Sequence, residues 1–124
     1  MTIVAVSTDQ APKPNGTYNQ AVAYGNLVFL SGQTPRDLEG NRLSHRTFDA
    51  QARQALDNLQ AIAKASGLSL RNCAKVTVYL QDPANAREFD LIYREYVSEP
   101  WPARTLVQSS FVDFEIEIEA ILIG

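Results

Sequence analysis

Phe114-Glu115-Ile116-Glu117-Ile118-Glu119-Ala120-Ile121, near the end of the chain, is the stretch that indicates the fold most clearly. Apolar and charged residues alternate along it, which is typical of a β-strand with one buried face and one polar face. The alternation predicts that Glu115, Glu117 and Glu119 share a face, each roughly 7 Å from the next. Three like charges in a row repel one another unless water or a cation screens them. We therefore expect a partner beside this carboxylate face.

An arginine on the preceding apolar stretch, Arg104–Gln108, is a candidate for that partner. A hairpin-like return through Ser109, Ser110 and Asp113 would bring Arg104 near the carboxylates. An arginine beside a carboxylate in a cleft can bind a small carboxylic acid with two hydrogen bonds, while the acidic group handles protons. The alternative is a solvated strand face with an ordinary surface ion pair, and these two segments alone favour that alternative.

The composition is that of one ordinary globular domain over residues 1–124, with 45% hydrophobic and 20% charged residues. A net charge of −3 argues against a dedicated nucleic-acid binder, which needs a basic stripe. The apolar runs Leu27–Leu30 and Ala120–Ile123 are too short to span a membrane. The first residues lack the basic start and the long apolar run of a signal peptide. We therefore expect a cytoplasmic protein with neither membrane nor nucleic acid as a partner.

The single histidine and the single cysteine restrict the possible chemistry. One cysteine forms no internal disulfide and no thiolate zinc cluster, and one histidine forms no histidine-rich metal site. His45 lies in a polar stretch and is expected at a loop or a helix start. Cys73 precedes an apolar strand and is expected to be a half-buried, inert thiol instead of a nucleophile. No metal site is predicted.

The spacing of apolar residues and the positions of turn-forming residues predict an α+β domain, in which two helices cover one face of a mixed sheet. On the second helix, Phe89, Tyr93 and Tyr96 have helical spacing and are expected in the core more than in a stacking set. The expected order is ββαβαββ, with a possible extra strand at the front. Strands are expected at Ile3–Val6, Tyr18–Tyr24, Leu27–Ser31 and Val76–Leu80, followed by the two C-terminal strands, with a hairpin turn at Gly25-Asn26. The first helix is expected over Phe48–Ala65 and ends before Gly67. The second helix is expected to begin at Asp82-Pro83 and to end at Glu99–Pro102.

A set of short motifs, in order over nearly the whole chain, resembles the Rid (YjgF-type) family of small enamine/imine deaminases. The family is also described as translation-inhibitor or L-PSP endoribonuclease-like proteins. No single motif is specific, but the ordered set is strong. It comprises Ala11-Pro12, Gly16-x-Tyr18-x-Gln20-Ala21, Gly25–Phe29, Ser31-Gly-Gln-x-Pro35, Gln51-x-Arg53–Leu59, Lys75-x-Thr77–Leu80, Pro102-Ala-Arg104 and Ile116–Ile121.

The resemblance implies a chorismate-mutase-like fold, a homotrimer with sites between subunits, and cofactor-independent hydrolysis of 2-imino or enamino acids to 2-keto acids and ammonia. By the same resemblance Arg104 binds the substrate carboxylate, Ser31 and Gly32 assist, and Tyr18 closes over the substrate. Glu117 positions water or passes a proton. Its neighbours Glu115 and Glu119 would raise its pKa while Arg104 would lower it.

Several positions around that site depart from the family pattern. Thr17 replaces a proline, which leaves the Tyr18 loop less rigid. Thr105 and Leu106 follow Arg104, and Leu106 makes that wall of the site more apolar. Asp90 stands where many members have asparagine, and its charge would weaken binding of the standard substrate. The residues expected at the substrate are Thr105, Leu106, Asp90 and Phe89. Phe89 or Asp90 would face the cleft from a neighbouring subunit, with Arg104 and Glu117 in one chain.

Two other functions remain open from the sequence. One is a metabolite-binding or chaperone-like regulatory protein that uses the same pocket without turnover. The other is an endoribonuclease, against which the acidic balance and the single loop histidine argue. An excess of apolar strand surface also predicts that the protein is not a monomer, because two helices cover one face of a sheet only.

Overall fold

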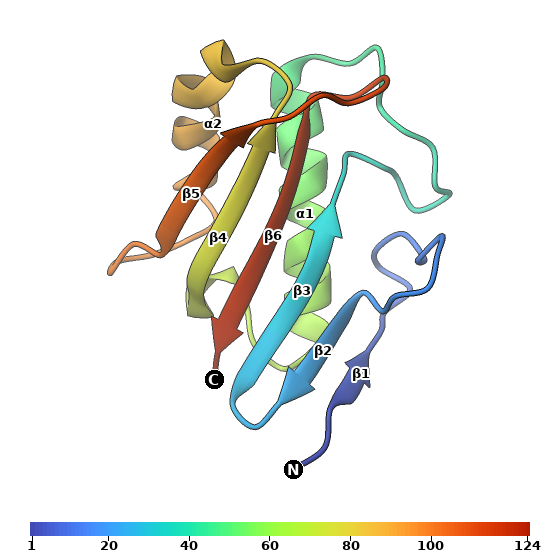
Figure 1. Cartoon of the computed structure of the whole chain (residues 1–124), viewed down its shortest axis with the longest axis vertical. Helices are drawn as coiled ribbons and strands as arrows, with labels where there is room; N and C mark the ends of the chain where they lie inside the picture. Colours follow the sequence, from blue (N-terminus) through green and yellow to red (C-terminus); the bar gives the residue numbers. More distant parts are fainter.

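The computed structural model describes residues 1–124, which form one six-stranded sheet and two α-helices (Figure 1). The extra strand at the front is present, so the predicted order of elements is confirmed. The elements are β1 (Val4–Val6), β2 (Ala21–Tyr24), β3 (Leu27–Gln33), α1 (Phe48–Ala65), β4 (Cys73–Leu80), α2 (Ala86–Tyr93), β5 (Ala103–Gln108) and β6 (Ile116–Ile123), with 3-10 turns at Leu70–Asn72 and Pro83–Asn85.

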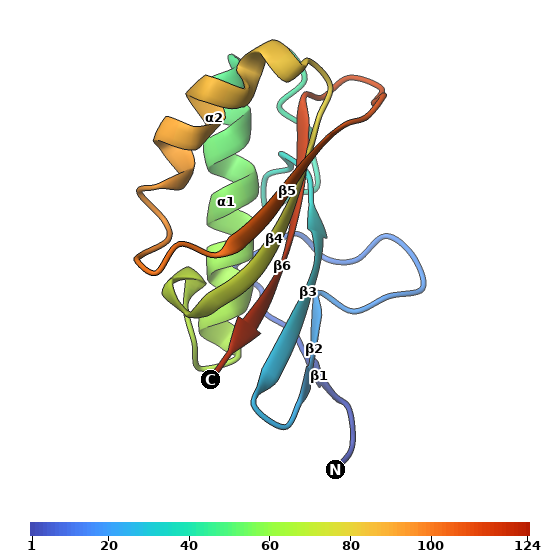
Figure 2. The same cartoon turned by 60° about the vertical axis from the view of Figure 1, so that its left-hand side comes forward.

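The sheet is mixed, and its strands lie in the order β1-β2-β3-β6-β4-β5. Only the pair of β4 and β5 is parallel, because α2 connects these two strands as a crossover. Both helices lie on the same side of the sheet, and the opposite face carries no helix (Figure 2). The predicted two-layer α+β architecture is confirmed.

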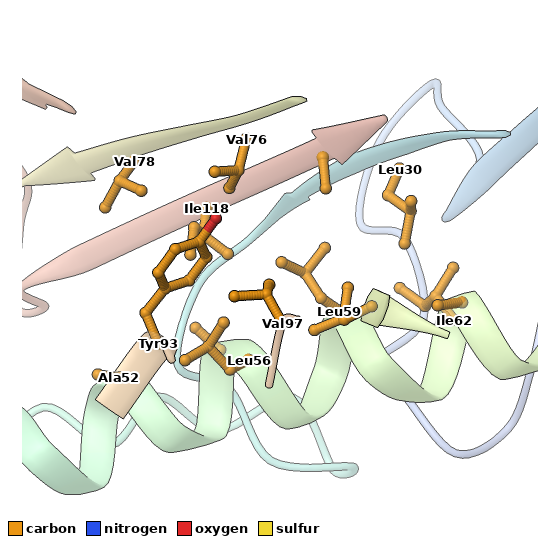
Figure 3. Close-up of a cluster of buried hydrophobic side chains, with 14 of the residues drawn as sticks. Leu30, Ala52, Leu56, Leu59, Ile62, Val76, Val78, Tyr93, Val97 and Ile118 are labelled. Atoms are coloured by element: carbon orange, nitrogen blue, oxygen red, sulfur yellow. The ribbon is translucent and has the colours of Figure 1, made fainter. Parts of the chain in front are cut away.

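The core lies between this sheet and α1 (Figure 3). The alternation along β6 turns Ile116, Ile118, Ala120 and Leu122 toward the helices, and all four are buried. On α1, a stripe of fully buried residues at helical spacing meets them, and each large aliphatic side chain there contributes roughly 1.5–3 kcal/mol of burial. The stripe comprises Ala52, Ala55, Leu56, Leu59, Ile62 and Ala63.

Local signals set the limits of the first hairpin and of α1 as predicted. Gly25 takes a φ of 59° in the two-residue turn between β2 and β3. The hydroxyl of Thr47 accepts a hydrogen bond from the Ala50 N–H and caps α1. Gly67, with a φ of 88°, follows the end of that helix.

Two predicted elements were too long. Tyr18 lies in a loop before β2, because its N–H and its hydroxyl bond to Gly16 and Asn15 within a local turn. The second helix begins only at Ala86, after a separate 3-10 turn that Asp82 caps, and it ends at Tyr93. Tyr96 lies beyond that end, where it packs partly buried against the core.

The predicted hairpin-like return from the Arg104 strand to the carboxylate strand was wrong. β6 pairs with β3 on one side and with β4 on the other, so β4 separates it from β5. Adjacency along the chain suggested a hairpin. The crossover through α2, however, places β5 parallel to β4 at the sheet edge.

The helix-free face carries apolar side chains from both central antiparallel strands. Leu27 and Phe29 on β3 and Ile121 and Ile123 on β6 alternate with buried residues, and Phe29 and Ile123 are 40% and 45% exposed. This distribution agrees with the expected excess of apolar strand surface. Neither helix has the length and apolar composition needed to cross a lipid bilayer.

Candidate active site in two parts

Arg104 lies on the edge strand β5 and faces the helix side of the sheet. Its position in the parallel register is opposite Val76, a buried residue whose side chain belongs to the core. A cavity of about 470 Å³ opens beside the guanidinium, between β5, α2 and the segment that precedes β5. Its lining consists of Asp90, Tyr93, Arg94, Trp101, Pro102 and Arg104.

A carboxylate of the same chain already contacts the guanidinium. Arg104 Nη1 donates to Asp90 Oδ1 at 2.7 Å, and Arg94 Nη2 donates to Asp90 Oδ2 at 2.7 Å. The hydrogen bond from Arg104, and then that from Arg94, holds the pKa of Asp90 below its usual range. The other N–H groups of Arg104 have no partner in the chain, so they can still bind one further carboxylate.

Two aromatic rings of α2 lie close to the same guanidinium. Arg104 Cζ lies 5.3 Å from the ring centroid of Tyr93 and 5.9 Å from that of Phe89, within the range of a cation–π contact. Phe89 is fully buried and cannot touch a ligand, so its expected place at the substrate was wrong. Its core role, which the helical spacing predicted, is confirmed. The hydroxyl of Tyr93 points toward the sheet (Figure 3) and is buried without a hydrogen-bond partner.

Glu117 lies on β6 and faces the helix-free side of the sheet. Its register partner is Tyr79, whose side chain shares that face. A groove of about 410 Å³ opens there, and Glu117, Tyr18, Ser31 and Gly32 all line it. The structure therefore brings four of the predicted site residues together.

The Glu117 carboxyl has no hydrogen-bond partner in the chain, and its pKa is raised. Burial is the main cause and the charge of Glu119 is the second, while the nearby Arg42 lowers it. The prediction that Glu115 and Arg104 act on this group was wrong. Glu115 precedes the strand, and Arg104 lies on the other face of the sheet.

Gly32 allows the carboxyl to lie against the backbone of β3. A side-chain Cβ at this position would overlap Glu117 Oε2 and lie 3.0 Å from its Cδ. The absence of a side chain at Gly32 thus fixes where the Glu117 carboxyl lies. This is a steric reason for the Ser-Gly pair, in addition to the expected role of its amide.

Hydrogen bonds order the loop that carries Tyr18. The Tyr18 hydroxyl donates to Asn15 Oδ1 at 2.9 Å, and the Ser31 hydroxyl donates to the Asn19 carbonyl at 2.6 Å. Tyr18 is 43% exposed at the rim of the groove. The Ser31 hydroxyl therefore anchors the loop, and its lone pairs can still accept from a ligand.

Arg104 and Glu117 do not meet within one chain, and their expected pairing in one chain was wrong. Arg104 contacts α2 on the helix side, whereas Glu117 lines the groove on the opposite face. Asp90 was expected from a neighbouring subunit but contacts Arg104 of its own chain. Thr105 faces away from the Arg104 cavity and accepts a hydrogen bond from Lys75, and Leu106 packs against the core.

The sequence analysis missed several lining residues. Asn15, Arg36, Arg42 and Phe114 line the Glu117 groove, and Trp101 lines the Arg104 cavity. Most of them lie in loops without hydrophobic periodicity. A signal was present for Trp101 alone, because it directly precedes the Pro-Ala-Arg motif.

Cys73 and His45 take no part in either cavity. Burial raises the pKa of the Cys73 thiol to about 11, which agrees with an inert cysteine. His45 is exposed in the loop before α1. No group of three or more His, Cys, Asp or Glu side chains is arranged to hold a metal ion.

Comparison with known proteins relates this chain and its fold to one family. The family described as Endoribonuclease L-PSP matches residues 8–123. A RutC family protein of Pyrococcus horikoshii is 42% identical over 94% of this chain and 94% of its own length. The 2-iminobutanoate/2-iminopropanoate deaminase of Dermatophagoides farinae is 32% identical over 95% and 94%. The crystal structure of RidA from a Psychrobacter species superimposes with a TM-score of 0.90 at 38% identity, over 97% of this chain and 98% of that one.

Proposed function

The chain belongs to the Rid family, the Endoribonuclease L-PSP family of the sequence comparison, and we propose that it hydrolyses reactive 2-imino and enamino acids to 2-keto acids and ammonia. The observation that carries the proposal is the unpartnered Glu117 carboxyl with its raised pKa, in a groove with Tyr18, Ser31 and Gly32. A carboxyl whose pKa is raised by burial holds and releases a proton nearer to neutral pH.

In the proposed reaction Arg104 binds the substrate carboxylate and fixes the imine carbon. Glu117 holds the attacking water, whose oxygen forms a bond to that carbon. The carbon–nitrogen bond then breaks, the nitrogen leaves as ammonia with protons from the water, and the carbon keeps the oxygen as a ketone. An imine hydrolyses in water without help, so orientation and one acid–base group, worth roughly 10²–10⁴ in rate, are sufficient.

We also propose that each site is shared between two subunits of a homotrimer. Arg104 and Glu117 lie on opposite faces of one sheet, so a substrate that contacts both requires two copies of the chain. The exposed apolar side chains Phe29 and Ile123 on the helix-free face support such an assembly. One subunit would supply Arg104 with Asp90, and its neighbour would supply Glu117 with Tyr18 and Ser31.

A turnover assay tests the reaction directly. 2-Imino acids are made in situ by an amino-acid oxidase, and the loss of the imine is followed with and without the protein. We expect faster hydrolysis with the protein. Binding of the substrate without faster hydrolysis would favour a metabolite-binding protein, and cleavage of RNA in place of imine hydrolysis would favour the endoribonuclease.

Sedimentation or light scattering at micromolar concentration tests the assembly. We expect a mass of three chains, and a mass near 13.7 kDa, that of one chain, would contradict a shared site. The two measurements are independent, because a monomer that hydrolyses imines would refute only the assembly.

A further inference from the structure

Arg36 and Arg42 form a feature of the Glu117 groove that hydrolysis of simple imino acids does not use. They lie directly opposite each other in a short antiparallel ladder within the loop after β3. Backbone hydrogen bonds of 2.9 Å flank the pair on both sides. The pair is therefore of the non-hydrogen-bonded type, in which opposed side chains come closest.

Two guanidinium groups at opposed positions repel each other unless an anion compensates them. The chain supplies none within 4 Å, because its ion pairs engage Arg53, Arg94 and Arg104. Both Arg36 and Arg42 line the Glu117 groove. With Glu117 ionised, these three side chains still carry a net positive charge.

The ladder is held in place from several sides. The buried Asn58 on α1 donates to the Arg36 carbonyl at 2.9 Å and to the Thr34 carbonyl at 3.3 Å. One carboxylate oxygen of Asp37 accepts two backbone N–H groups of the turn. The Arg42 guanidinium lies over the Phe114 ring, 4.1 Å from its centroid. The backbone at both arginines and the side chain of Arg42 are thus held in place before an anion binds, which lowers the entropic cost of binding.

We propose that Arg36 and Arg42 bind a second anionic group of the substrate, so that the protein prefers dicarboxylic 2-imino acids to monocarboxylic ones. This inference rests on the proposed function. In the shared site Arg104 of one subunit binds the carboxylate beside the imine carbon. The arginine pair of the subunit that supplies Glu117 binds the carboxylate at the far end of the same substrate.

The test compares the imines that an oxidase makes from glutamate and from 2-aminobutanoate. We expect wild-type kcat/KM to favour the dicarboxylic imine by about tenfold or more, the effect of one charge-assisted contact. The double variant Arg36→Gln/Arg42→Gln lowers this ratio by about tenfold, mainly through KM. Arg46→Gln makes the same kind of charge change at an exposed arginine outside the groove, and it leaves the ratio unchanged.

Three results would overturn the proposal. The first is a wild-type protein without preference, and the second is a double variant that affects both substrates equally. The third is a double variant with a changed sedimentation mass and an unchanged ratio, which would assign the arginine pair to a subunit contact.

If neither imine is turned over, the proposed function fails and binding decides the inference separately. 2-Oxoglutarate and 2-oxobutanoate, the corresponding keto acids, are titrated into wild type and the double variant. Tighter binding of the dicarboxylic acid that the double variant loses would support the subsite. Equal binding of the two keto acids would overturn it. So would displacement of 2-oxoglutarate by inorganic phosphate at the same concentration as by 2-oxoglutarate itself, because any anion would then bind equally well.

Discussion

The Arg104 cavity and the Glu117 groove are similar in size but opposite in how their charges are balanced. In the cavity, Asp90 pairs with both Arg104 and Arg94. In the groove, Glu117 has no hydrogen bond, and Arg36 and Arg42 face each other without a carboxylate partner. Charged side chains that pair within the chain stabilise the packing of that chain. Charged side chains without such a partner are free to bind a ligand. Under the proposed function, we therefore expect the groove to carry the chemistry and the cavity to position the substrate.

Glu117→Gln should have the largest effect, because it removes proton transfer but keeps the shape of the groove. We expect kcat to fall by about 10²–10⁴-fold while KM changes little. The variant should also be more stable than wild type at neutral pH. A carboxyl whose pKa is raised on folding contributes most below its unfolded pKa, and this contribution decreases as the pH rises through the folded value.

Steady-state kinetics and thermal unfolding measure both effects of that change. Glu119→Gln is the matched control, since Glu119 shares the strand face but accepts a hydrogen bond from Tyr79. If Glu117→Gln has normal activity and Glu119→Gln has lost it, the catalytic carboxylate is Glu119 and our assignment of Glu117 is wrong.

Arg104→Lys tests the positioning part. Lysine keeps the charge but loses the planar fork that binds a carboxylate with two hydrogen bonds, so kcat/KM should fall by about 10²-fold. The fold should survive, because Arg104 lies on an edge strand. Circular dichroism checks the fold, and near-normal imine hydrolysis by this variant would refute the assignment of Arg104.

Gly32→Ala tests whether the groove depends on the place of the Glu117 carboxyl. The added methyl group would displace that carboxyl from β3, and we expect kcat to fall by about tenfold. Thermal stability should change little, since the group displaced is the end of a flexible side chain. Unchanged kinetics would mean that the position of the carboxyl is not critical.

Asp90→Asn should have the smallest effect and the opposite sign. It frees Arg104 for the substrate, so KM should fall by about three- to tenfold. The lost ion pairs are partly exposed and should cost less than about 1 kcal/mol at neutral pH.

The pH dependence of that stability difference gives a second readout. The pKa of Asp90 is lowered on folding, chiefly by the hydrogen bond from Arg104. Its contribution is therefore present above the unfolded pKa and is lost as the pH falls through the folded value. Denaturant unfolding at neutral and acidic pH should show the difference between wild type and Asp90→Asn shrink in acid. A raised KM in this variant would mean that Asp90 helps to hold the substrate.

The sequence predicted the architecture well because the decisive signals are local. The alternation over 114–121 predicts a strand and separates its two faces, and Gly25 and Gly67 mark a turn and a helix end correctly. Hydrophobic periodicity identifies strands but does not tell which strands are neighbours in the sheet. The order of β6, β4 and β5 could therefore not be predicted from the pattern.

The candidate site was predicted in part for a related reason. The family motifs contain Tyr18, Ser31, Gly32 and Glu117, and the structure brings these four together. The stretch after Arg104 is apolar on both faces and does not reveal that Arg104 faces the helices. Arg36 and Arg42 escaped notice because their opposition depends on backbone pairing within a loop, which leaves no periodic trace in the sequence.

The placement of Arg104 and Glu117 on opposite faces of one sheet has a consequence for genetics. If neighbouring subunits share each site, an allele that lacks Arg104 and an allele that lacks Glu117 should complement each other. In randomly mixed oligomers, about one quarter of the sites combine an intact arginine from one chain with an intact glutamate from the other. Two alleles with the same defect would give no such rescue. A cell that carries both defective versions would thus keep part of an activity that neither version has alone.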